Sequence, residues 1–235
     1  MGDTMTLSEH LGLLATLDWL AAIWFVGLWL FLGWIIEHPP KSRPSVTVLM
    51  SQRRRDWMAV FVLREPRIFD SQILASLRQG TSFFASTCLL AIGGTLALIK
   101  NTDPLQGVAA DFSAQVAPSL VLQVKLALVL LFLTNAFLKF VWANRVFGYC
   151  AVMMAAVPND PSDPATTPRA AAAGELNIRA AMNFNRGLRA MYFALGAVAW
   201  LLGPWALIGA SFVTGWIVFS REFASIPRQI LMKEM

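Results

Sequence analysis

Long apolar stretches are the feature that most constrains the fold of this chain. Four of them interrupt the 235 residues, at about 13–36, 82–99, 118–157 and 190–219. A helix needs about 20 mostly apolar residues to cross the ~30 Å hydrocarbon core of a bilayer. A soluble fold of this size could not bury a chain that is 57% hydrophobic and only 14% charged. We therefore predict an all-α integral membrane protein.

The third and fourth stretches are too long for a single span each. Residues 118–157 would form a helix of roughly 60 Å, so we place the span at about 119–139 and expect the helix to continue beyond it. Within 190–219, a glycine followed by a proline at 203–204 has the order in which one helix ends and another begins. Two interpretations stay open: a tight hairpin, which we favour, or one helix kinked at Pro204. The predicted fold is a polytopic helical bundle of four spans, or five if the pair is a turn.

Basic residues alternate between the connecting segments. Segment 37–80 carries eight Lys or Arg and segment 138–189 carries six, whereas 1–12 and 101–117 carry none. Because cytoplasmic loops are enriched in Lys and Arg, this alternation predicts that the N-terminus and segment 101–117 lie outside and that segments 37–80 and 138–189 lie in the cytoplasm. We expect residues 1–235 to form a single membrane domain.

The cytoplasmic segments, 37–80 and 140–189, are expected to be partly helical. Residues 46–64 mix apolar and basic side chains, which is typical of an amphipathic helix at the membrane interface. Residues 157–173 are rich in Pro, Asp and Ala and are predicted to form a flexible loop. An amphipathic helix is expected to resume over 175–189.

Four sequence blocks resemble a known family. They are the RxxxW run at 53–57 and the longer blocks REPRIFDSQILASLRQGTSFFASTCLLAIGG (64–94), LKFVWANRVFGYCAVMMAAVP (138–158) and FNRGLRAMYFALGAVAWLLGPW (184–205). Together they make residues 15–224 similar to the domain-of-unknown-function family 599. The resemblance implies a small bacterial multi-span membrane protein and implies no activity.

Polar residues inside the predicted spans are candidates for function. Asp18 and Lys125 lie in spans that both start from the outside, so we expect them at a similar depth, roughly 9–10 Å into the membrane. Charges there are costly unless they are paired or hydrated, and we hypothesise an Asp18–Lys125 ion pair. It could fix helix register or act as a gate or relay for protons or ions; snorkelling to the interface is the other possibility.

Asn135 and Lys139 share a helix face with Lys125. A face lined by two amines and an amide predicts either a path for a small anion or hydrogen bonding between helices. With Asp18, these residues form the candidate intramembrane polar site.

Small residues gather on the second span. They are Ser82, Ser86, Gly93, Gly94 and Ala97. In lipid, helices associate by close backbone approach rather than by the hydrophobic effect. This pattern predicts helix packing, either within the bundle or between copies of the chain.

A basic cluster precedes the second span. Arg53, Arg54 and Arg55 stand beside Trp57, which predicts contact with anionic lipid headgroups. A site for a soluble anionic ligand is the alternative.

The sequence offers few residue combinations that are typical of catalytic sites. The two histidines, His10 and His38, fall on opposite sides of the predicted membrane, and no Ser-His-Asp set, phosphate loop or carboxylate dyad is visible. We therefore predict no enzyme, and no catalytic, cofactor-binding or metal site. The net charge of +5 follows from topology, so we expect no nucleic-acid partner.

Two functions remain in view. The first is a non-enzymatic accessory or scaffold subunit of an inner-membrane complex, or a homo-oligomer, with membrane lipids and other membrane subunits as partners. The alternative is a channel or transporter for a small anion or protons that uses Asp18, Lys125, Asn135 and Lys139.

Overall fold

The computed structural model describes residues 16–104 and 118–234, and this part of the chain is helical and has no strands. The helices in chain order are α2 (Thr16–Glu37), α3 (Val46–Phe61), α4 (Ile68–Lys100), α6 (Ser119–Ala155), α7 (Thr166–Val198), the 3₁₀ helix η1 (Ala199–Leu202), α8 (Pro204–Phe223) and α9 (Ile226–Lys233). The prediction of an all-α bundle is confirmed. The start of the first apolar stretch, His10 and most of the 101–117 connector lie outside the described residues.

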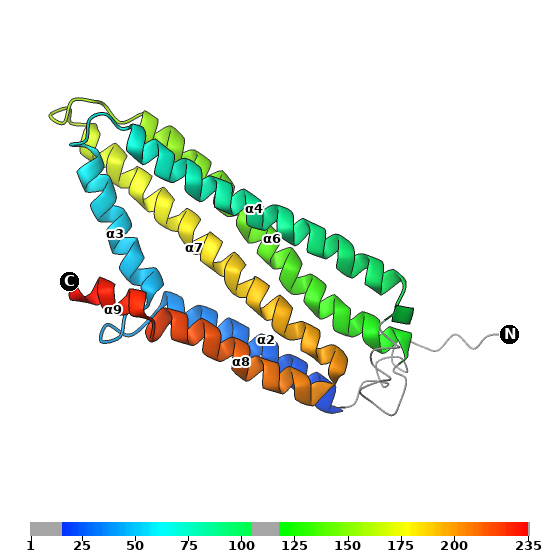
Figure 1. The fold of residues 1–235 in the computed structure, drawn as a ribbon. Coiled ribbons are helices and arrows are strands. Elements are labelled where there is room, and N and C mark those ends of the chain that lie inside the picture. The colour runs from blue at the N-terminus through cyan, green and yellow to red at the C-terminus, as the bar shows by residue number, and fades with distance from the viewer. Residues whose placement is uncertain (1–15, 105–117, 235) are drawn as a thin grey trace.

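The helices form two pairs with α7 between them (Figure 1). One pair is α4 with α6, the other is α2 with α8, and α3 bridges the two at one end of the molecule. The most extensive contact in the fold joins α6 and α7. Among the described helices, α2, α4 and α6 are long and apolar enough to cross a membrane, which indicates a membrane protein.

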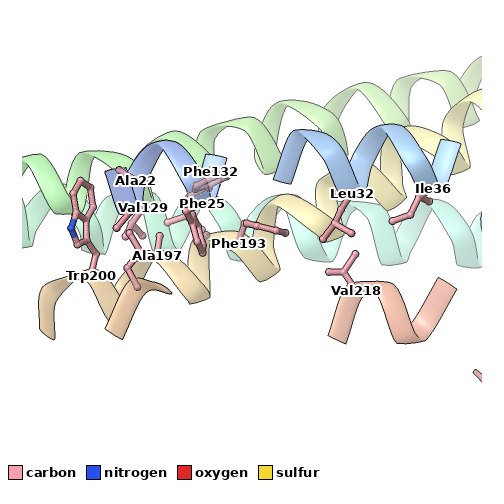
Figure 2. Packing of buried hydrophobic residues seen from close by; sticks show 14 of the residues in the cluster. Ala22, Phe25, Leu32, Ile36, Val129, Phe132, Phe193, Ala197, Trp200 and Val218 are labelled. Atoms are coloured by element: carbon pink, nitrogen blue, oxygen red, sulfur yellow. The ribbon is translucent and has the colours of Figure 1, made fainter. Parts of the chain in front are cut away.

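Aromatic rings from three helices form the centre of the core (Figure 2). Phe25 of α2 lies 5.0 Å from Phe193 of α7 and 5.7 Å from Phe132 of α6, measured between ring centroids. All three side chains are fully buried. Aromatic pairs at such distances contribute about 1 kcal/mol each beyond the area they bury, so these rings hold α2 against the α6–α7 pair.

The approach of α6 to α7 depends on a glycine. A Cβ atom at Gly187 would lie 2.7 Å from the ring of Phe140. Any larger residue would push the helices apart, because close-packed interiors tolerate little extra volume.

The chain reverses at Gly203. This residue has a φ of 120°, in a region that favours glycine, and it separates η1 from α8, whose first residue is Pro204. Helix α8 then runs back beside α7 and α2 (Figure 1). The hairpin interpretation is confirmed, and the single helix kinked at Pro204 is wrong.

Two of the predicted segment boundaries can be compared with the structure. Helix α6 continues past residue 139 to Ala155, as expected. The loop prediction is wrong over 166–173, because α7 already begins at Thr166. Pro168 falls in the first turn of α7, where proline is tolerated. The following alanines are strong helix formers, and Ala170 and Ala173 are buried.

Candidate functional site

Asp18 and Lys125 meet in the bundle as a buried pair. Lys125 Nζ of α6 lies 3.6 Å from Asp18 Oδ1 of α2, and their side chains are only 8% and 12% exposed, respectively. Trp200 of η1 donates from Nε1 to the same carboxylate oxygen at 2.8 Å. The Lys125 ammonium also lies 5.9 Å from the Trp200 ring. These three residues form a closed cluster in which one negative charge balances one positive charge.

A second buried acid lies at the other end of α2. Glu37 accepts from Arg186 Nε at 2.8 Å and also from Arg189, both on α7. The Glu37 side chain is 11% exposed and that of Arg189 only 8%. The hydrogen bond to Glu37 raises the pKa of the Arg186 guanidinium. Glu37, Arg186 and Arg189 therefore form a cluster with one more positive than negative charge.

This Glu37 cluster opens onto a cavity of about 310 Å³, called here the basic cavity. Its lining comes from α2, α6 and α7: Trp29, Leu30, Gly33, Glu37, Asn135, Lys139, Arg186 and Arg189. Lys139 makes no ion pair with any residue of 16–104 or 118–234. Three cationic groups and one carboxylate thus line one hollow.

The structure divides the predicted polar site into two. Asn135 and Lys139 line the basic cavity together with Arg186 and Arg189. Asp18 and Lys125 instead lie with Trp200, toward the opposite end of α2. Their role, structural or functional, stays a prediction.

The small residues of α4 mostly face away from the bundle. Ser82 accepts a hydrogen bond of 2.7 Å from Asn144 of α6. The other four, Ser86, Gly93, Gly94 and Ala97, are exposed, and we call them the small-residue face. A Cβ atom at Gly93 or Gly94 would meet no other atom within 4 Å, so this face packs against nothing in the described part of the chain.

The basic cluster of α3 is engaged within the chain. Arg53 Nη1 donates to Asp56 at 3.2 Å, and Arg55 Nε donates to Glu175 of α7 at 2.7 Å. Arg54 bonds to Asn177 of α7, and burial lowers the pKa of its guanidinium. Trp57 Nε1 donates to the buried Asp70 at 2.7 Å. The contacts with Asn177, Glu175 and Asp70 dock α3 against α7 and the start of α4, and the lipid-contact role stays a prediction.

Residues 20–227 match the family described as "Protein of unknown function, DUF599". The chain belongs to this family. The resemblance noted from its sequence blocks is thereby confirmed. No curated protein and no solved structure matches the chain.

Sequence reasoning missed four residues that shape the two clusters of this DUF599 protein: Glu37, Arg186, Arg189 and Trp200. A signal for three of them is present. Arg186 and Arg189 are three apart and share a helix face, and Glu37 is an acid at the very end of an apolar stretch. Nothing in the sequence singles out Trp200 from the other eight tryptophans.

Proposed function

We propose that this DUF599 protein is a non-enzymatic scaffold of the bacterial inner membrane, which assembles with copies of itself through α4. One observation carries the proposal. Only 11% of the most apolar 18-residue window of α4 is buried, against 44% of the corresponding window of α6. A helix of 33 residues that touches one main neighbour leaves most of its surface for lipid or for another chain.

The small-residue face supports self-association in particular. In lipid, close approach of backbones stabilises a helix pair, and Gly, Ala and Ser permit that approach. The face carries no charge, so it needs no complementary charge on a different partner. A two-fold symmetric dimer buries the same patch on both copies, so the patch must be complementary to itself. A flat row of small residues meets this requirement, because two such rows can pack closely against each other.

The charge alternation along the chain supports the orientation. The basic segments 37–80 and 140–189 would lie in the cytoplasm and the N-terminus in the periplasm. The ends of α4, α6 and α7 nearest α3 would then project into the cytoplasm (Figure 1).

The test is the substitution Gly93→Leu, which adds a bulky side chain to the small-residue face. Gly209→Leu is the matched control, because Gly209 of α8 is also an exposed helical glycine with open space around its Cβ. Mass spectrometry from a mild detergent should show an oligomer for wild type and Gly209→Leu, and monomer for Gly93→Leu. A monomeric wild type would contradict the proposal, and a fixed ratio to foreign subunits would indicate an accessory role instead.

The basic cavity supports a second candidate, a channel or transporter for a small anion. Lys139, which has no ion pair among the residues that the structure describes, and the two arginines could attract an anion. A proton path has less support, because the side chains of the Asp18–Lys125 pair are buried and Trp200 donates a hydrogen bond to the carboxylate. Chloride flux into proteoliposomes that Lys139→Gln abolishes would favour this candidate, and absence of flux would exclude it for chloride.

A further inference from the structure

An apolar groove lies between α2 and α6 beside the basic cavity. Its volume is about 570 Å³, and its lining includes Ile23, Val26 and Leu30 of α2, Leu128 and Leu131 of α6, and Trp200. Leu30 lines the basic cavity as well, so the two hollows adjoin. An apolar surface and a cationic one therefore follow each other along the same side of α2.

The groove is closed beneath and open at the side. Its most deeply buried lining residues are Ala22 of α2 and Trp200 of η1, which are 8% and 2% exposed. Its rims are exposed: Ile23 is 66% exposed and Leu131 54%. In a bilayer this opening would face the acyl chains of the lipids.

The cavity and the adjoining part of the groove together match the depth of one leaflet. Glu37 lines the cavity and Gly27 lines the groove, and they are ten positions apart on α2, which is about 15 Å at 1.5 Å per residue. Half of the ~30 Å hydrocarbon core is about 15 Å. An acyl chain whose headgroup lies in the basic cavity would therefore reach about the middle of the membrane near Gly27.

The charge of the cavity favours an anion. Lys139, Arg186 and Arg189 line it with the single carboxylate of Glu37, an excess of two positive charges. Glu222 of α8, whose carboxylate accepts from Thr47 at 3.0 Å, lies outside the lining and offsets only part of this excess at Arg189. Arg and Lys are the side chains that bind phosphate best.

We infer that the basic cavity and the apolar groove together bind one acidic phospholipid of the cytoplasmic leaflet. Its phosphate lies beside Lys139 and Arg186, and one acyl chain follows the groove along α2. A free anion would leave the groove unused, and a neutral apolar molecule would leave the excess charge unbalanced. Gly27 lines the groove and Gly33 the cavity, and neither has any atom within 4 Å of a Cβ position, so α2 leaves room for the lipid.

The headgroup is tested with Lys139→Gln. The purified protein is incubated with mixed micelles of phosphatidylglycerol and phosphatidylcholine, and retained lipid is counted by native mass spectrometry. Wild type should retain one phosphatidylglycerol in preference to phosphatidylcholine. Lys139→Gln should lower that preference about fivefold, the contribution of one lysine beside acidic lipid. The control Lys100→Gln, at the exposed end of α4, should leave it unchanged.

The acyl chain is tested with Gly27→Leu, which fills the groove and should abolish lipid retention. Gly209→Leu, the same change at another open glycine, should retain the lipid. Wild-type retention in both Lys139→Gln and Gly27→Leu would overturn the inference. Loss in Gly27→Leu alone would show a neutral lipid site, and displacement by inorganic phosphate would show a soluble-anion site; either would overturn it. The same spectra report the oligomeric state, so association through α4 is judged separately.

Discussion

The two buried charge clusters at the ends of α2 differ in balance and in access. At Asp18, one carboxylate meets one ammonium and one indole N–H, and both charged side chains are buried. At Glu37, one carboxylate meets two guanidinium groups beside an open cavity that also holds Lys139. A charge without a partner in apolar surroundings requires a counter-ion or water. The protein alone satisfies the first cluster, whereas the second has positive charge to spare for a ligand.

The strongest test of this comparison is Asp18→Asn. The amide can still accept from Trp200, but Lys125 is left buried without its counter-charge. Breaking a buried ion pair on one side costs about 3 kcal/mol or more. We expect that loss in the free energy of unfolding, measured by titrating the detergent-solubilised protein with sodium dodecyl sulfate.

The matched control is the double variant Asp18→Asn with Lys125→Met. Methionine replaces the lysine stem without a charge, so most of the lost stability should return. If the double variant is as unstable as the single one, Asp18 and Lys125 do not act as a pair.

Glu37→Gln should have a smaller effect, about 2 kcal/mol. It leaves two arginines side by side, but the Arg186 side chain is 38% exposed and solvent in the cavity screens part of the repulsion. The same unfolding titration measures it. If Glu37→Gln lowers the free energy of unfolding more than Asp18→Asn does, then the Glu37 cluster is the less accessible to solvent of the two, contrary to what we propose.

Lys139→Gln should have the smallest effect on stability, within about 0.5 kcal/mol in the absence of lipid. Lys139 has no ion pair in the described ranges, and substitutions of this kind change stability little. Thermal unfolding in a lipid-free detergent measures it. A marked loss of stability would mean that Lys139 supports the fold itself, and it would contradict the view that this lysine is available for a ligand.

Much of the fold could be predicted because hydrophobic pattern and turn chemistry are local. The apolar stretches gave α2, α4 and α6, and the Gly203-Pro204 pair gave the reversal before α8. The start of α7 could not be predicted from composition, because prolines and aspartates that favour a loop stand directly before alanines that favour a helix. Burial of Ala170 and Ala173 against neighbouring helices decides between them.

The candidate site was less accessible to sequence reasoning. Asp18 and Lys125 were expected to pair only because both lie at a similar depth in spans that start from the same side of the membrane. The structure places them 3.6 Å apart. The partners of Glu37 depend on how α7 lies across α2, which no pattern within either helix specifies. For the same reason, periodicity placed small residues on one face of α4 but could not show that this face points away from α6.

The unbroken length of α6 has a mechanical consequence. Its 37 residues extend about 55 Å, roughly 25 Å more than a hydrocarbon core requires. In the proposed topology the protruding portion is rigidly continuous with the part that spans the lipid, so both tilt together. Spanning helices adjust to bilayer thickness by tilting, and a tilt of only about 10° would displace the cytoplasmic end of α6 by about 4 Å. A change in bilayer thickness would therefore move this end in the cytoplasm.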